Sequence, residues 1–338
     1  METTDFARHL ADFFAKYLPA ERGASKNTIQ AYRDTFVLLF GFMEQEKRLK
    51  PKKLRLDDLS KENITGFLDW LETVKENCVR TRNARLAAIR SFFEYLQYVE
   101  PGNILECQRV MSIHIKKTGK KVMNYLTVEG IRLLLKQPDQ STWRGRRDLA
   151  LIALMYDTGA RVQEIADLKV GSVRLSEPHT ITILGKGNKA RIVPMMKEQM
   201  VLLIRYMQEN CLLQDTCRPT PLFFNARNEK LTRAGITYVL QKYLHTARQE
   251  DTSLIPEGIS CHSLRHSKAM HLLQSGVPLI YIRDLLGHES VVTTEVYARA
   301  DSLQKRKALE NAFEKVSDDS KLPSWQTNQN LLDWLKSL

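Results

Sequence analysis

Cationic side chains, histidines and one tyrosine stand at predicted turns and helix ends in the second half of the chain. In CHSLRHS, residues 261–267, His262 and Arg265 lie one helical turn apart, so an imidazole and a guanidinium could converge on one anion. His262 and His266 could instead hold a metal ion. However, serine follows His262 where an HExxH zinc helix has its glutamate, and Arg265 would repel a divalent cation. An anion site is therefore favoured over a metal site. A structural histidine pair is the alternative, and His266 is expected to be structural.

Arg161, in DTGARVQEIADL, stands between two predicted helices. Apolar residues recur at helical spacing over residues 148–156, Gly159 ends that helix, and the next begins at about Arg161. A cation at a helix start opposes the positive end of the helix dipole, so helix propensity does not explain this arginine. With the free backbone N–H groups it would bind an oxyanion strongly, and Glu164 could orient its guanidinium. A surface ion pair is the alternative.

Three further residues suit the same anion. The GKGNK turn of a predicted β-hairpin over residues 181–195 carries Lys186 at its tip. His288 follows a glycine that ends a helix, and Tyr297 lies on the helix after it. Each residue is unremarkable alone, but the set surrounds an anion with cations and supplies one nucleophile. No acidic cluster is present to bind magnesium, as two-metal phosphoryl transfer requires.

At these residues the sequence resembles the tyrosine recombinases, also called the phage-integrase family. The matching stretches, in the family's order and spacing, are TGARVQEIADL, GKGNKARIVPM, HSLRH, LLGH and the tyrosine of TTEVYARA. The stretch NTIQAYRDTFVLLFGFM resembles the family's core-binding domain. The resemblance covers most of residues 1–310.

The resemblance implies a role for each residue. Arg161 and Arg265 would clamp the scissile phosphate, and Tyr297 would attack it to form a 3′-phosphotyrosyl link and release a 5′-hydroxyl. The other implied roles are a general acid at Lys186, a general acid/base at His262, a hydrogen-bond donor to phosphate at His288 and support of Arg161 by Glu164. A phenol with a pKa of about 10 needs such help at neutral pH. Because the phosphotyrosine stores the backbone energy, no metal or other cofactor is expected.

The resemblance implies double-stranded DNA with specific recombination sites as the partner. The chain would bind as a homo-oligomer, with a dimer on each site and a tetramer in synapsis, and accessory recombination proteins could act with it. Integration, excision or transposition of a mobile genetic element is the favoured role, and Xer-type resolution of chromosome or plasmid dimers is the alternative. A type IB topoisomerase and a non-catalytic DNA-binding regulator are the rival classes.

Composition agrees with a DNA-binding enzyme. The 338 residues suggest about two domains, and the net charge of +12 would attract a polyanion. No apolar run approaches the roughly 20 residues of a membrane span, and no secretory signal is visible, so a cytoplasmic protein is expected. Five cysteines without a CxxC pair predict reduced, structural thiols.

The pattern predicts a mainly α fold with a small antiparallel sheet. The expected parts are a helical, SAM-like core-binding domain at 1–103, a basic linker at 104–125, a catalytic domain at 126–315 and a tail at 316–338. The tail ends in LLDWLKSL, which would dock on a neighbouring subunit or on its own domain. Basic residues that would contact DNA, with a solvated surface as the alternative, are Arg80, Arg82, Arg85, Arg90, Lys116, Lys117, Lys120 and Lys121.

Overall fold

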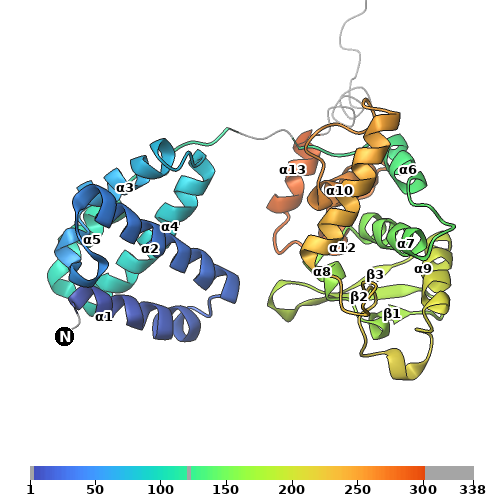
Figure 1. Cartoon of the computed structure of the whole chain (residues 1–338), viewed down its shortest axis with the longest axis horizontal. Helices are drawn as coiled ribbons and strands as arrows, with labels where there is room; N and C mark the ends of the chain where they lie inside the picture. Colours follow the sequence, from blue (N-terminus) through green and yellow to red (C-terminus); the bar gives the residue numbers. More distant parts are fainter. Residues whose placement is uncertain (1–3, 120–122, 301–338) are drawn as a thin grey trace, which may run out of the picture. The chain divides into compact units, whose positions relative to one another are not determined.

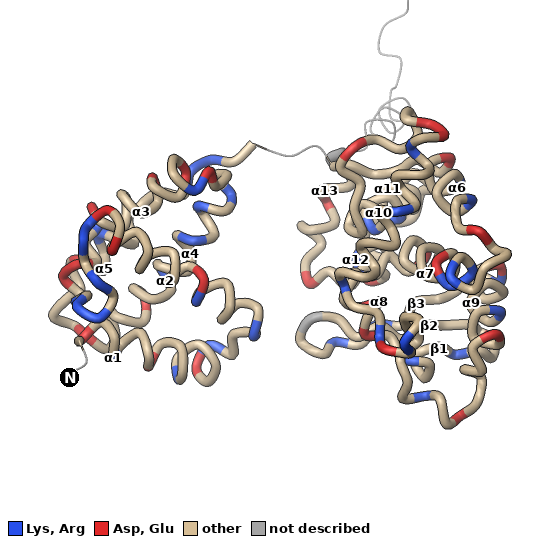
Figure 2. Tube along the Cα trace, in the orientation of Figure 1, with Lys and Arg blue, Asp and Glu red and all other residues tan. Residues whose placement is uncertain are grey.

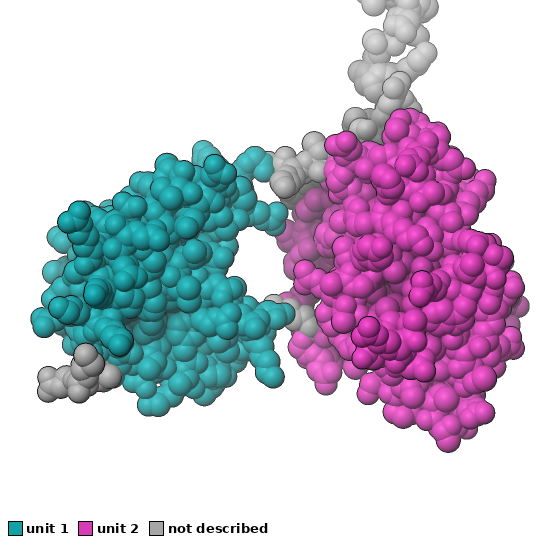
Figure 3. Space-filling view, in the orientation of Figure 1, with its two compact units in different colours: residues 1–121 teal, residues 122–338 magenta. Residues whose placement is uncertain are grey.

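The computed structural model describes residues 4–119 and 123–300 and divides the chain into two compact units, residues 1–121 and 122–338 (Figure 3). In its described residues unit 1 is helical (Figure 1). Its helices are α1 (Asp5–Asp12), a π-helical segment (Phe13–Glu21), α2 (Lys26–Lys47), α3 (Lys61–Thr73), α4 (Val79–Val99) and α5 (Ile104–Met111), with 3₁₀ turns at Pro51–Lys53, Leu56–Asp58 and Pro101–Asn103.

Local signals and an aromatic core explain the helices of unit 1. Ser60 caps α3 by accepting a hydrogen bond from the backbone N–H of Asn63, and α4 ends just before Pro101. Phe13 is fully buried and packs edge to face on Phe92 with ring centroids 5.2 Å apart. This cluster joins the π-helical segment to α4.

The predicted linker at 104–125 is wrong in its first part. Residues 104–111 form α5, which packs on α4 and buries Cys107 and Val110 in the core of unit 1. Ile113 belongs to the same core. The sequence did not predict α5 because the segment is short and a cationic stretch follows it. The helical unit therefore extends beyond residue 103.

The basic face of α4 is largely structural. The guanidinium of Arg82, only 3% exposed, donates to the backbone carbonyl of His114, that of Arg85 donates to the carbonyl of Ala31, and that of Arg90 donates to those of Met111 and Ile113. Figure 2 shows basic positions along α4. Burial of Arg82 contradicts its predicted contact with DNA, whereas Arg80 is exposed.

The cationic stretch after α5 divides into three parts. The ammonium of Lys116 is paired with the carboxylate of Glu72 on α3, so this lysine is tied to unit 1. Lys117 is exposed. Lys120 and Lys121 lie outside the described residues. Lys116 is exposed as well, so among the described linker lysines Lys117 is the one that is exposed and makes no ion pair.

Unit 2 is helical around a small sheet. Its helices are α6 (Val128–Lys136), α7 (Trp143–Thr158), α8 (Val162–Ala166), α9 (Lys197–Glu209), α10 (Arg233–Glu250), α11 (Cys261–Gln274), α12 (Leu279–Leu286) and α13 (Val292–Ala300). Its strands are β1 (Val173–Arg174), β2 (Thr180–Leu184) and β3 (Ala190–Pro194), and 3₁₀ turns lie at Val170–Ser172, Lys186–Asn188 and Asp215–Cys217. The sheet is antiparallel in the order β1-β2-β3, which confirms the predicted fold class.

The register of the hairpin decides which of its side chains face inward. Ile181 pairs with Val193, Ile183 pairs with Arg191, and Ile181, Ile183 and Val193 are fully buried. Because side chains alternate along a strand, Arg191 points to the same inner face as Val193. Ile192, between them, is exposed. An arginine is thereby directed into the interior of unit 2.

Within residues 4–119 and 123–300, every helix is too short or too polar to span a bilayer. The predicted tail at 316–338 lies outside the described residues.

Candidate active site

Arg161 lies at the start of α8, as the sequence predicts. Gly159 ends α7 in the left-handed conformation at φ +55°, and Arg161 is the N-cap of α8. The backbone N–H of Arg161 donates to Glu164 Oε2 at 2.9 Å, and its guanidinium donates to Glu164 Oε1 at 2.8 Å. The Arg161 side chain is still 41% exposed, so it can meet a ligand while Glu164 orients its guanidinium.

Arg191 is a site residue that the sequence analysis missed. Its guanidinium donates to Glu164 Oε2 at 2.7 Å and to the backbone carbonyl of Leu285 at 2.9 Å. Gly287 leaves room for it, since a Cβ there would lie 3.0 Å from Arg191 Cδ. Arg191 thus ties β3 to Glu164 and to the end of α12.

Glu164 is a buried carboxylate shared by two arginines. Burial alone would raise the pKa of Glu164, but hydrogen bonds from Arg191 and Arg161 outweigh it and lower the pKa. The carboxylate is therefore ionised at neutral pH and fixes the positions of both guanidinium groups.

Replacing Glu164 with glutamine should lower the free energy of unfolding by about 3 kcal/mol, because two guanidinium groups lose the anion between them. The pKa of Glu164 is lower in the folded state than its ordinary value of 4.5. Its contribution is therefore complete above about pH 4.5 and is lost as the pH falls through the lowered folded-state pKa. Urea unfolding of both proteins across this range measures the difference.

Glu129→Gln is the matched control for Glu164. Glu129 is exposed and lies 3.7 Å from Arg132 in a surface pair, so its loss should change stability by less than about 0.5 kcal/mol. Equal effects of the two substitutions would show that Glu164 is no more than a surface anion.

Arg265 is buried, with 1% of its area exposed, and joins two helix ends. Its guanidinium donates to the backbone carbonyls of Gly159 and Leu286, each at 2.7 Å. These carbonyls lie at the C-termini of α7 and α12, where the helix dipoles favour a cation. Burial, followed by repulsion from Arg161, lowers the pKa of Arg265 to about 10, so the side chain remains charged at neutral pH. Its Nε is buried without a hydrogen-bond partner among the described residues.

The two histidines of CHSLRHS lie near the start of α11. The N-cap is Ser260, which exchanges capping contacts with Ser263, so His262 lies inside the first turn. The His262 and His266 rings meet edge to face with centroids 4.3 Å apart. Desolvation, followed by repulsion from Arg265 and Arg161, lowers the pKa of His262. The neutral form of His262 is favoured.

Tyr297 lies on α13 and is buried, with 2% of its area exposed. Its hydroxyl lies 3.0 Å from His266 Nδ1, and its ring lies parallel to that of His288 with centroids 6.4 Å apart. His288 Nδ1 lies 2.9 Å from Thr294 Oγ1. Burial raises the pKa of Tyr297 and lowers that of His288 to about 4. The tyrosine is therefore held as a neutral phenol among neutral imidazoles.

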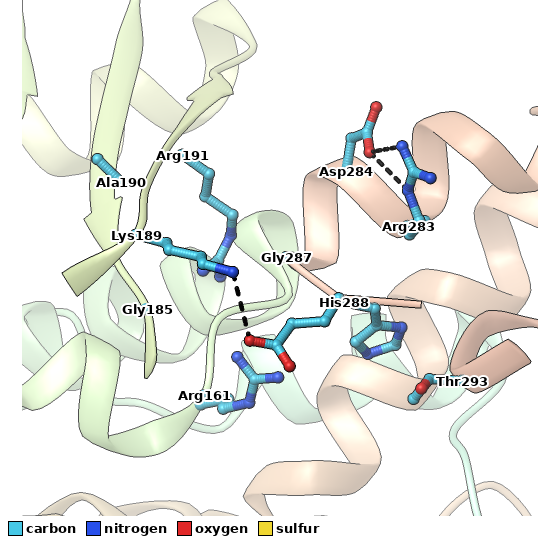
Figure 4. Close-up of a pocket in the computed structure, with 11 residues that line it drawn as sticks. Arg161, Gly185, Lys189, Ala190, Arg191, Arg283, Asp284, Gly287, His288 and Thr293 are labelled. Atoms are coloured by element: carbon cyan, nitrogen blue, oxygen red, sulfur yellow. Dashed lines mark hydrogen bonds and ion pairs between the residues drawn. The ribbon is translucent and has the colours of Figure 1, made fainter. Parts of the chain in front are cut away.

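A cationic cavity of about 530 Å³ opens beside these residues (Figure 4). Its charged lining consists of Arg161, Lys189, Arg191, Arg283, Asp284 and Glu289, and it includes His288. Figure 4 shows the Arg161, Arg191 and Lys189 side chains converging, with Lys189 paired to Glu289 at 3.5 Å. Arg265 and Tyr297 do not line this cavity. The cavity suits an anion that two arginines would contact.

Lys186 lies in the turn between β2 and β3, which Gly187 and Asn188 form at φ +72° and +60°. The Lys186 side chain falls outside the described part of the chain.

The described residues contain no group of three or more histidine, cysteine, aspartate or glutamate side chains that could hold a metal ion.

Comparison with known proteins identifies relatives over nearly the whole chain. Residues 108–304 match the phage integrase family, and residues 11–98 match the phage integrase N-terminal SAM-like domain. The integrase/recombinase y4rC of Sinorhizobium fredii is 36% identical over 329 residues, which cover 97% of this chain and 97% of that protein. Tyrosine recombinase XerD of Listeria innocua is 32% identical over 87% of this chain and 95% of that protein.

A solved structure shares the fold. The XerH site-specific recombinase, bound to difH substrate in a pre-cleavage complex, aligns with a TM-score of 0.65 and 23% identity. The alignment covers 89% of this chain and 84% of that one.

Proposed function

Because the chain belongs to the phage integrase family and is a site-specific DNA recombinase, we propose that it cuts DNA through a 3′-phosphotyrosyl link formed by Tyr297. The observation that carries this proposal is the placement of Tyr297 among His266, His288 and a cavity lined by Arg161. A tyrosine beside a cationic phosphate site has the chemistry of a covalent phosphoryl-transfer enzyme.

The cations have two tasks, which are binding and charge stabilisation. Arg161, oriented by Glu164, would hold one non-bridging oxygen of the scissile phosphate at the cavity. Arg265 would hold the other after exchanging part of its contact with the helix carbonyls for the phosphate. His288 would donate to a phosphate oxygen, and His262 would act as a general acid/base.

Tyr297 must meet the scissile phosphate to attack. It does not line the cavity, and α13 packs against α11 and α12 through a small apolar cluster that includes Met270 and Ile282. Attack by Tyr297 on phosphorus would release the 5′-oxygen, and Lys186 would protonate it. A rearrangement on DNA binding that brings the scissile phosphate to the Tyr297 hydroxyl, beside His266, is therefore part of the proposal.

The proposed partner is double-stranded DNA with specific recombination sites. The protein would bind this DNA as a dimer on each site and as a tetramer in synapsis. Arg80 and Lys117 are exposed cations of unit 1 that could contact its backbone. The tail would link neighbouring subunits, and action on DNA would place the protein in the cytoplasm. Accessory recombination proteins would act with the tetramer.

We further propose that the chain serves a mobile genetic element, by integration, excision or transposition. Its similarity to the integrase/recombinase y4rC extends over 97% of both chains, whereas that to XerD covers 87% of this chain. Xer-type resolution of chromosome or plasmid dimers is the second candidate because the XerD match is almost as high in identity. Sequencing of the DNA that the protein joins in cells separates the two, since element ends and dimer-resolution sites differ in location.

Covalent capture on a randomised DNA library tests the enzyme proposal. Nicked duplexes with randomised sequence around the nick would be incubated with the full chain, and denaturant-stable adducts would be isolated and sequenced. The proposal expects one recovered sequence class linked through Tyr297. A non-catalytic regulator gives no adduct, and a type IB topoisomerase relaxes supercoiled DNA without paired copies of the recovered site.

Chelation should leave the chemistry unchanged. Excess EDTA is expected to alter the rate of adduct formation on the captured duplex by less than about twofold, because the proposed charge stabilisation comes from arginines and the nucleophile is a phenol. A loss of activity in EDTA that returns with added divalent metal would contradict the proposed mechanism.

A further inference from the structure

The hydroxyl of Tyr297 makes its hydrogen bond, within the described residues, to His266. Nδ1 of His266 lies 3.0 Å from the hydroxyl oxygen, and the rings meet edge to face with centroids 5.6 Å apart. We propose, on the premise of the recombinase mechanism above, that His266 is a catalytic residue that takes the hydroxyl proton of Tyr297 as this oxygen attacks the phosphate. The sequence motif had suggested a structural role for His266.

The proton balance of the step is complete. The O–H bond of Tyr297 breaks and its proton passes to Nδ1 of His266, while the tyrosine oxygen bonds to phosphorus. The bond from phosphorus to the 5′-oxygen breaks, and this oxygen takes a proton from a separate acid, for which Lys186 is the candidate. In rejoining, the imidazolium of His266 returns its proton to the departing tyrosine oxygen.

The surroundings of His266 keep an acceptor nitrogen available. Burial, followed by repulsion from His262 and Arg265, lowers the pKa of His266 to about 4. The imidazole is thus neutral at neutral pH, and one of its nitrogens carries a free lone pair. A bound phosphodiester would offset the charge of Arg265 and raise the pKa of His266, so proton affinity would increase when the substrate is present.

The neighbouring histidines are less well placed for this task. His288 lies parallel to the Tyr297 ring, and its Nδ1 contacts Thr294 instead of the hydroxyl. His262 contacts the ring of His266 and is exposed. Of the three histidines, His266 is the one with a nitrogen in contact with the reacting oxygen.

Asparagine at position 266 separates proton transfer from positioning. Its side-chain oxygen can occupy the place of Nδ1 and accept a hydrogen bond from Tyr297, but it cannot take a proton at neutral pH. We expect His266→Asn to slow single-turnover adduct formation on the captured duplex by about 100-fold. Noncovalent DNA affinity and the melting temperature should change little. A rate within threefold of wild type, or a faster rate, would overturn the proposal.

A modified DNA identifies which proton His266 handles. A duplex with a 5′-bridging sulfur at the scissile phosphate releases a thiolate, which needs no protonation. On this DNA the defect of Lys186→Ala should be relieved and that of His266→Asn should persist. Relief of the His266→Asn defect would assign His266 to the leaving group and would refute its role toward Tyr297.

The wild-type protein provides a test that does not depend on the folding of a variant. Nuclear magnetic resonance of isotope-labelled histidine, assigned through contacts with the Tyr297 ring, should find the proton of His266 on Nε2. A proton on Nδ1 would mean that His266 donates to the tyrosine oxygen, which overturns the proposal. Covalent capture through Tyr297 tests the recombinase mechanism separately, so either conclusion can fail while the other stands.

Discussion

Replacing Tyr297 with phenylalanine is expected to abolish the covalent DNA adduct, with a loss of at least about 10⁴-fold in rate, because the substitution removes the proposed nucleophile. The ring of Tyr297 is buried and would be retained, so the packing of α13 should survive. The lost hydrogen bond to His266 should cost about 1 kcal/mol of stability. Single-turnover reactions on the captured duplex, stopped in denaturant, measure the adduct.

The matched control is Tyr281→Phe. Tyr281 lies on α12 in the same unit and is exposed, so removal of its hydroxyl should leave the adduct rate within about twofold of wild type. Gel-shift measurements should give both variants the noncovalent DNA affinity of wild type. An adduct that persists in Tyr297→Phe would move the nucleophile to another residue.

The sequence predicted the elements around the site because their signals are local. Gly159 and Gly287 have positive φ at helix ends, as their positions suggested, and the GKGNK turn joins two paired strands. Arg161 at the start of α8 and Tyr297 on α13 followed from the same boundaries. Helix ends and hairpins depend on a few adjacent residues, so a single sequence suffices to locate them.

Arg191 could not be identified in this way because its role depends on strand register. Residues 191 to 193 read Arg-Ile-Val, and apolar residues therefore occupy both faces of β3. Only pairing with β2 fixes Arg191 inward and Ile192 outward. One observation about the motif could have raised the question, because Arg191 follows Lys186 closely in GKGNKARIVPM.

The burial of Arg82 on α4 could not be predicted, for a related reason. Helical spacing places Arg82, Arg85 and Arg90 beside an apolar stripe, but it does not reveal which carbonyls lie opposite. The segment around α5 supplies these carbonyls for Arg82 and Arg90. A sequence that predicts a linker at residues 104–125 offers no carbonyl partners for these arginines.

Arg265 is expected to contribute both to the stability of unit 2 and to catalysis. Replacing it with alanine should lower the free energy of unfolding by about 3–5 kcal/mol, because the carbonyls of Gly159 and Leu286 would lose their donor and a cavity would form. Urea unfolding measures this loss. The exposed arginine Arg132, replaced by alanine, should change stability by less than about 0.5 kcal/mol.

Lysine at position 265 keeps the charge and permits a test of the chemistry in a folded protein. A single ammonium cannot reproduce the two-pronged contact of the guanidinium with Gly159 and Leu286, nor could it bind a phosphate in a bidentate manner. We expect Arg265→Lys to lower stability by about 2 kcal/mol and the adduct rate at saturating DNA by about 10³-fold. Arg132→Lys should leave both quantities unchanged. Full activity in Arg265→Lys would mean that this position needs only a positive charge. The bidentate clamp on the phosphate would then have to be assigned to Arg161 and Arg191, two of the arginines that line the cavity.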